Sequence, residues 1–150
     1  MQKGDSRSET GKQRNKIEML HSYRIQTKER EGFYNITRQV ASAVLQSGVQ
    51  EGLCVIQVPH TTAGITVNEN ADPDVVSDMK FGFRKAFPES AEYHHMEGNT
   101  TAHLKCTTVG ATQTVIISGG KLLLGMWQGI YFCEFDGPRN RTYYVKIIEG

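Results

Sequence analysis

The second half of the chain constrains the fold most, because from residue 102 onward it is a succession of short apolar runs separated by turn signals. Gly119-Gly120 and Asp136-Gly137-Pro138 are two of these turns. The pattern predicts five strands, at 102–108, 113–118, 121–125, 127–135 and 141–148. Strands joined by short turns pair in antiparallel fashion, so this half favours an antiparallel sheet that curls or forms a sandwich.

Three further strands are predicted in the first half, at 23–27, 53–58 and 63–68. The first alternates apolar with polar residues, as a strand with one buried face does. The second is a short run dense in β-branched residues that ends at Pro59, which is typical of a buried strand. The chain should therefore contain about eight strands.

Two segments of the first half have helical spacing instead. Apolar residues recur at helical intervals over 36–47, with Asn35 as a candidate N-cap and Gly48 as a C-terminal stop. Asp72-Pro73 combines a capping carboxylate with proline at the first helical position, and the apolar face that follows predicts a second helix to about residue 87. The expected fold is α+β: a single domain with a mainly antiparallel, curled or sandwich-like sheet and two inserted helices.

The beginning of the chain differs from the rest in composition. Residues 1–16 contain no apolar residue except Met1 and hold five Lys or Arg against Asp5 and Glu9. Such a segment cannot bury enough surface to offset its ordering entropy, so a flexible basic tail is expected at 1–16 and one domain at 17–150. The alternative is a basic arm for an anionic partner.

Charge, apolar runs and cysteines exclude several classes of protein. The net charge of +1 argues against a chain-wide nucleic-acid surface. No apolar run approaches the ~20 residues that span a bilayer. The three cysteines, Cys54, Cys106 and Cys133, are too few and too widely spaced for a disulfide framework or a CxxC zinc site. We expect a cytoplasmic protein with neither a nucleic-acid nor a membrane partner.

The segment 60–74, HTTAGITVNENADPD, is the first candidate for chemistry. His60 follows a predicted buried strand, where the chain leaves the sheet and side chains can face a cleft. Glu69 lies in a strand-to-helix connection and has no evident structural task. Asp72 is most simply a helix cap, and Asn70 a turn residue. Acids near a helix N-terminus could otherwise hold a cation.

The segment 94–105, HHMEGNTTAHLK, is the second candidate. If 102–108 is a strand, His103 and Lys105 lie on one face while Ala102 and Cys106 lie on the other. Two histidines eight residues apart, His95 and His103, could then converge on one metal ion. Their spacing is not diagnostic, and a lone strand histidine is more often a surface or core residue.

The third candidate, 125–141, carries the only tryptophan. Strand alternation places Trp127 and Tyr131 on one face and Glu134 on the other, beside large apolar residues. A carboxylate on such a face needs a partner, which could be a metal or a subunit neighbour, or an arginine such as Arg139 or Arg141 if the strand is at an edge. The cysteines at apolar strand positions are expected to act as small hydrophobes rather than nucleophiles.

These three segments together resemble the signature motifs of the YjbQ-like family, whose members are labelled secondary thiamine-phosphate synthases. The resemblance covers roughly residues 19–148. It implies a compact α+β domain that assembles as a homotrimer, with a histidine- and acid-lined pocket near the subunit interfaces. It also implies a thiamine-phosphate synthase activity, in which hydroxymethylpyrimidine diphosphate is joined to thiazole phosphate with loss of pyrophosphate.

The resemblance and the residue types together give a hypothesis for the site. A divalent metal, zinc or magnesium, would be held by His60, His95 and His103. Pyrophosphate departure needs a divalent cation or a Lys or Arg to neutralise the developing charge, and Glu69, Asp72 and Lys105 are residues of the right types. Glu69 or Glu134 would act as a metal ligand or proton acceptor. These four residues are the predicted catalytic residues. The side chains assigned to substrate binding are Thr61, Asn68, Asn70, Asn99, Trp127 and Gln128. The alternative function is a non-catalytic trimer that binds a small ligand or a metal.

Overall fold

The structure is a computed structural model that describes residues 19–150. The tail predicted at 1–16 lies outside the described residues. Eight strands and three helices follow one another in the order β1 (Leu20–Gln26), β2 (Gly32–Asn35), α1 (Thr37–Ser47), β3 (Gly52–Gln57), β4 (Ala63–Glu69), α2 (Pro73–Ala86), α3 (Thr100–Val109), β5 (Thr112–Ser118), β6 (Lys121–Leu122), β7 (Gln128–Glu134) and β8 (Asn140–Glu149). None of these helices is long and apolar enough to cross a membrane.

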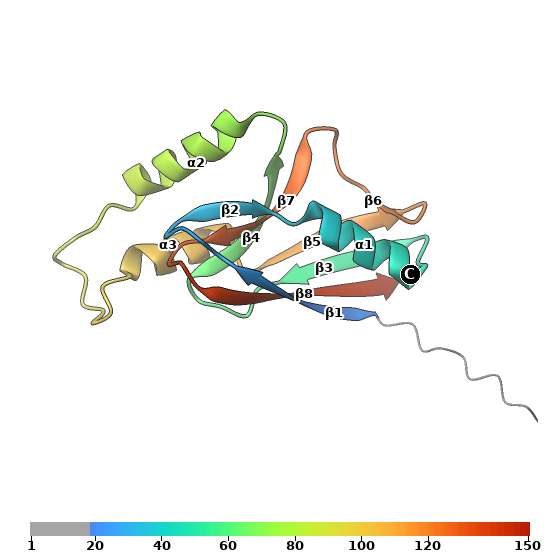
Figure 1. The fold of residues 1–150 in the computed structure, drawn as a ribbon, viewed down its shortest axis with the longest axis horizontal. Coiled ribbons are helices and arrows are strands. Elements are labelled where there is room, and N and C mark those ends of the chain that lie inside the picture. The colour runs from blue at the N-terminus through green and yellow to red at the C-terminus, as the bar shows by residue number, and fades with distance from the viewer. Residues whose placement is uncertain (1–18) are drawn as a thin grey trace, which may run out of the picture.

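The strands form two antiparallel sheets (Figure 1). One has five strands in the order β1-β8-β3-β5-β6, and the other has three in the order β2-β7-β4. Every pairing between these strands is antiparallel. The predicted α+β domain with an antiparallel, sandwich-like arrangement is confirmed.

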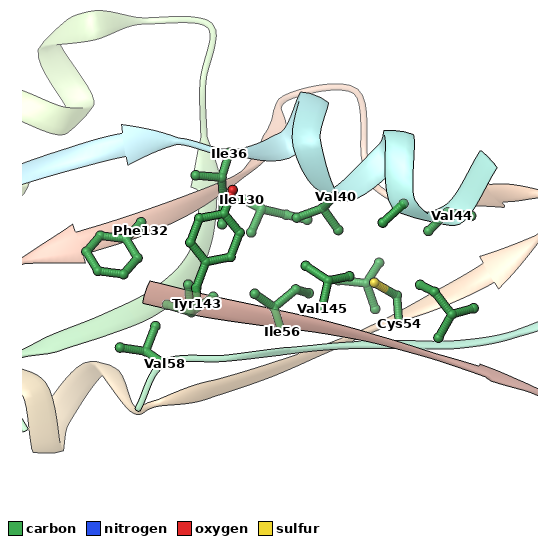
Figure 2. Close-up of a cluster of buried hydrophobic side chains, with 14 of the residues drawn as sticks. Ile36, Val40, Val44, Cys54, Ile56, Val58, Ile130, Phe132, Tyr143 and Val145 are labelled. Atoms are coloured by element: carbon green, nitrogen blue, oxygen red, sulfur yellow. The ribbon is translucent and has the colours of Figure 1, made fainter. Parts of the chain in front are cut away.

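The main core lies between the two sheets and α1 (Figure 2). Val40 and Val44 point from α1 toward Val145 of β8, while Phe132 of β7 and Tyr143 of β8 face each other across the layers. Each fully buried side chain of this size contributes about 1.5–3 kcal/mol to stability. The core therefore holds the two sheets together and fixes the strand ends that carry the candidate site.

A second apolar cluster lies on the opposite face of the three-stranded sheet. Tyr131, Cys133 and Phe135 pack there against Ala102 and Cys106 of α3. Strand β7 is thus buried on both faces, as its central position requires, and the predicted alternation along it is confirmed. The cysteines are free and buried, and burial raises the pKa of the Cys106 thiol, so they behave as small hydrophobes.

The predicted strand at 102–108 is wrong, because Thr100–Val109 is helix α3. Ala102 and Cys106 suit a strand face, but they are also one helical turn apart and meet the β7 cluster together. The helix lies so close to β4 that a Cβ added at Gly64 would come within 2.7 Å of the Gly110 carbonyl oxygen. The short strand β2 was also missed, since four residues carry little periodic signal.

The other two helices follow their predicted bounds. Helix α1 begins at Thr37, and its N-cap is Ile36 rather than the predicted Asn35. Asn35 lies one residue earlier, where its Oδ1 accepts from the Thr37 N–H at 3.0 Å. The helix ends at Gly48 in the left-handed region, as predicted. Helix α2 is capped by Asp72, whose Oδ1 accepts from the Asp74 N–H at 2.9 Å. Unlike α1, α2 has no buried residue, and it lies at the top left of Figure 1. It contacts the second apolar cluster through Phe83, whose ring centroid lies 6.5 Å from that of Phe33 and 5.9 Å from that of Phe135.

Candidate functional site

The structure brings the three predicted histidines to one cavity of about 380 Å³ beside α3. We call it the histidine pocket, and its lining residues are Pro59, His60, Thr61, Thr62, His95, Glu97, Asn99, His103, Asp136, Arg139 and Arg141. They come from the β3–β4 connection, the segment before α3, the first turn of α3, the β7–β8 connection and the start of β8. Residues far apart in sequence therefore converge, which is the usual geometry of a ligand site.

His95 and His103 form a close pair in this pocket. Their ring centroids are 5.2 Å apart and the rings are inclined at 79°. His103 lies one helical turn after Asn99, the N-cap of α3, so the helix places the side chains of Asn99 and His103 on the pocket side. Imidazoles are the side chains best suited to accept and donate protons near neutral pH.

His60 has a different role, because its Nε2 accepts a hydrogen bond from the Thr142 N–H at 2.9 Å. That nitrogen therefore carries no proton, and the neutral ring carries its proton on Nδ1. Burial lowers the pKa of His60, and the nearby Arg141 guanidinium lowers it further. His60 can thus donate from Nδ1, but its Nε2 is not available to a metal or a proton.

A buried ion pair between Glu134 and Arg141 lies beneath the pocket. Glu134 is 0% exposed, and it accepts from Arg141 Nε at 2.8 Å, from Thr27 Oγ1 at 2.9 Å and from the Asp136 N–H at 2.9 Å. Burial raises the pKa of Glu134, but these hydrogen bonds outweigh it and hold the pKa below its ordinary value. Arginine pairing is thus the alternative that the structure supports, although β7 is central and not an edge strand.

Asn99 and Asp136 form the side of the pocket nearest the β7–β8 turn. Asn99 Nδ2 donates to Asp136 Oδ2 at 2.8 Å, and Arg139 Nη2 donates to the same oxygen at 2.9 Å. Burial raises the pKa of Asp136, but these hydrogen bonds and the charge of Arg139 lower it more. Asp136 was not predicted as a lining residue, because Asp-Gly-Pro is also a turn signal.

A second group of predicted residues lies elsewhere, at the far end of the β4–β7 ribbon. We call it the β4–β7 tip, and its members are Asn68, Glu69, Asn70, Trp127 and Gln128. Glu69 pairs with Gln128 in the strand register, and the Asn70 N–H donates to the Trp127 carbonyl at 2.8 Å. The seven residues of β4 span about 20 Å, so the tip and the histidine pocket are separate within one chain.

The comparisons with known proteins agree with this architecture. The family model described as UPF0047 protein YjbQ-like matches residues 21–150. The chain belongs to the YjbQ-like UPF0047 family. It is 53% identical over 131 residues to the UPF0047 protein YugU of Bacillus subtilis, covering 87% of this chain and 99% of that protein.

Solved structures of family members have the same fold. A YjbQ/UPF0047 protein of Clostridium acetobutylicum matches with a TM-score of 0.84 and 52% identity, covering 85% of this chain and 99% of that one. A YbjQ-like protein of Sulfolobus solfataricus also gives a TM-score of 0.84, at 32% identity, over 87% of this chain and 96% of that one. The family fold is thus maintained while two thirds of the residues change.

Besides Glu134, two more of the predicted catalytic residues have structural partners in this YjbQ-like domain. Asp72 caps α2, as its alternative interpretation proposed. Lys105 does not share a face with His103, because the helix turns it to the opposite side of α3, where its Nζ lies 3.0 Å from Glu31 Oε1. Thus neither residue lies in the histidine pocket, and only His60, His95, His103, Thr61 and Asn99 of the predicted site do.

The predicted three-histidine metal site does not fit this geometry. Within residues 19–150, no three His, Cys, Asp or Glu side chains are arranged to hold a metal ion. His60 uses Nε2 for the Thr142 N–H, which leaves the His95–His103 pair. Zinc takes at least three protein ligands and magnesium prefers oxygens, so a metal would need ligands beyond those the single chain assembles.

Proposed function

We propose that the histidine pocket is the active site of a small-molecule enzyme, with the thiamine-phosphate synthase activity that the family resemblance implies. The observation that carries the proposal is the convergence of His60, His95, His103 and Asn99 around one cavity of about 380 Å³. A cavity of this size suits a heterocyclic substrate. Its walls offer hydrogen-bond donors, an amide and two neighbouring imidazoles.

The proposed reaction moves charge in a way that these groups can assist. The thiazole nitrogen forms a bond to the methylene carbon of the pyrimidine, and the carbon–oxygen bond to pyrophosphate breaks with its electron pair. The leaving group therefore gains negative charge, which cationic or hydrogen-bond-donating side chains stabilise. Arg139 at the pocket wall and the Nδ1–H of His60 can supply such donors, and His95 or His103 can transfer a proton.

We further propose that the complete site forms between copies of a homotrimer. The β4–β7 tip carries Trp127, which is 59% exposed, next to Met126, which is 90% exposed. Adjacent exposed side chains of this size favour coverage by another protein surface. Within one chain, Glu69, Trp127 and Gln128 lie far from the histidine pocket. If the tip of one copy reaches the histidine pocket of the next copy, these three residues become part of the same site as the histidines.

A divalent cation belongs to the proposal only in that assembled form. The His95–His103 pair could contribute two ligands there, and a neighbouring copy or the substrate would have to contribute the others. Metal analysis of the purified protein tests this directly. Unchanged metal content in the His95→Ala/His103→Ala double variant would rule out the pair as ligands.

The second candidate function is a non-catalytic trimer that binds a small ligand in the same pocket. It is favoured by the neutralisation of both pocket arginines, since Arg139 is paired with Asp136 and Arg141 with Glu134. Little unpaired positive charge remains for a leaving pyrophosphate. A binder would show saturable affinity but would form no product when enzyme and substrate are equimolar.

The deciding experiment measures synthase product and rescue of a synthase-deficient strain. His103→Ala should reduce product formation by about 100-fold or more, because it removes a proposed proton-transfer group. His94→Ala is the matched control, since His94 is an exposed neighbouring histidine outside the pocket lining. Equal activity of wild type and His103→Ala would contradict the proposal.

The shared site has its own test by mixing inactive variants. Co-expression of His103→Ala with Trp127→Ala chains should restore about a quarter of the sites, because a random mixture pairs an intact pocket with an intact tip at that frequency. No recovery in verified mixed trimers would place both residues in the same chain's site.

A further inference from the structure

A second cavity, of about 360 Å³, lies against the opposite side of α3. We call it the lysine pocket, and its charged and polar lining consists of Arg30, Glu31, Arg84, Glu89, Thr101 and Lys105. Helix α3 separates the two pockets: Asn99 and His103 face one, and Thr101 and Lys105 face the other. No step of the proposed reaction uses the lysine pocket.

Lys105 at the inner wall of this pocket is the unusual feature. Lys105 is 2% exposed, yet among the described residues its ammonium group has a single hydrogen-bond acceptor, Glu31 Oε1 at 3.0 Å. An ammonium group carries three donors, and a buried charge is costly unless its hydrogen bonds are made. Two N–H groups of Lys105 are therefore left for an acceptor that the cavity can admit.

The carboxylates in the pocket do not balance its cations. Glu31 is shared, since Arg84 Nε also lies 3.4 Å from Glu31 Oε2. Arg30 pairs with Glu89 at 3.3 Å, but both side chains are mostly exposed, and such pairs contribute little and exchange readily. Three cationic side chains thus face two carboxylates, and the most deeply buried of the five side chains is the cationic Lys105.

A purely structural ion pair would look different, and the same molecule provides the example. Glu134 accepts four hydrogen bonds, two from Arg141 and one each from Thr27 and Asp136, in the buried pair beneath the histidine pocket. Lys105 and Glu31 instead border open space with donors to spare. This difference indicates that Lys105 binds a ligand rather than serving only as a structural ion pair.

We propose that the lysine pocket is a binding site for a compact, multiply charged anion of the phosphate class. Lys105 Nζ donates to the anion at the inner wall of the pocket, and Arg30 and Arg84 donate charge-assisted hydrogen bonds to it at the rim. The Thr101 hydroxyl, which now donates to Glu89 at 3.2 Å, lies on the same face of α3 and can turn to the ligand. Phe87 and Pro88 add apolar surface to the lining of the cavity.

The test measures binding of inorganic phosphate by calorimetry at constant ionic strength. Wild type should bind saturably, and Lys105→Met should bind at least about tenfold more weakly, because a charge-assisted donor is lost. Glu31→Gln should bind more tightly, since it removes a competing carboxylate. His103→Ala should leave phosphate affinity unchanged, which distinguishes this site from the proposed active site whether or not that proposal holds.

Three results would overturn the proposal. These are the absence of saturable phosphate binding by wild type, equal affinity of wild type and Lys105→Met, and loss of binding in His103→Ala with retention in Lys105→Met. If Lys105→Met does not fold, Arg84→Gln carries the test, because Arg84 is mostly exposed on the rim and its loss should weaken binding severalfold without unfolding the domain. Unchanged affinity in Arg84→Gln would then count against the site.

Discussion

Two ion pairs, each with at least one deeply buried member, differ in how completely their hydrogen bonds are made. In the Glu134–Arg141 pair, the carboxylate is 0% exposed and Arg141 also donates to Thr62 Oγ1 at 2.8 Å. In the Lys105–Glu31 pair, the lysine is equally deep but has one acceptor, and it borders a cavity. The first pair is closed and the second is open.

This difference separates a structural role from a binding role more clearly than residue type does. A carboxylate and a lysine are both common in active sites, and Glu134 and Lys105 were both predicted to be catalytic, Glu134 as a metal ligand or proton acceptor and Lys105 as a neutralising charge. The packed structure shows that Glu134 has no capacity left for a ligand, whereas Lys105 does. Unused hydrogen-bonding capacity beside a cavity is therefore the more informative property.

The largest effect is expected from breaking the closed pair. Arg141→Met should lower the free energy of unfolding by about 3–5 kcal/mol, because it leaves the buried Glu134 carboxylate without its countercharge. Urea unfolding followed by circular dichroism measures this loss.

Two controls accompany that prediction. Arg139→Gln removes a half-exposed arginine from its pair with Asp136 and should cost no more than about 1 kcal/mol. The double variant Arg141→Met/Glu134→Gln should regain part of the loss, since no buried charge remains. If Arg141→Met lost as little unfolding free energy as Arg139→Gln, the Glu134–Arg141 pair would not have the structural role assigned to it.

A smaller effect is expected from the open pair. Lys105→Met should lower the free energy of unfolding by about 1–2 kcal/mol, because Glu31 retains Arg84 as a partner and is partly accessible to water. Phosphate should raise the melting temperature of wild type but not of Lys105→Met. A loss as large as that of Arg141→Met would mean that Lys105 acts chiefly as a structural ion.

The smallest effect concerns His60, which lies beside the closed pair. Because its pKa is lowered in the folded state, unfolding binds a proton as pH falls below about 6.5, the ordinary histidine value. Stability from this group is therefore present above that pH and is lost as pH falls toward the folded pKa. His60→Gln should make the dependence of unfolding free energy on pH shallower there, by less than one proton. An unchanged slope would show that His60 titrates normally.

Local signals predicted much of the fold. Gly48 ends α1 and Asp72-Pro73 starts α2 as predicted, because caps act within a few residues of the chain. The N-cap of α1 is Ile36, one residue after the predicted Asn35. The segment 100–109 was assigned wrongly because Ala102 and Cys106 satisfy both a strand and a helix pattern. Only packing against Tyr131 and Cys133 selects the helix.

The candidate site was predictable in part for a similar reason. His60, His95 and His103 stood out by residue type, and the fold brings them together. Asp136 was not identified, because an Asp-Gly-Pro turn has the same sequence whether or not its carboxylate faces a cavity. Glu69 and Trp127 were grouped with the histidines, but a strand of about 20 Å separates them in one chain.

By itself, the sequence determined the α+β class, most strands, the two capped helices and the candidate histidines, because these depend on spacing along the chain. Tertiary structure alone decided that opposite faces of α3 line two different pockets. It also decided which buried charged group has all of its hydrogen bonds made. The physical reason is that hydrogen-bond partners are not local: Glu134 is completed by Thr27, 107 residues away, and Lys105 meets Glu31, 74 residues away. Only folding makes Glu134 structural and leaves donors of Lys105 available.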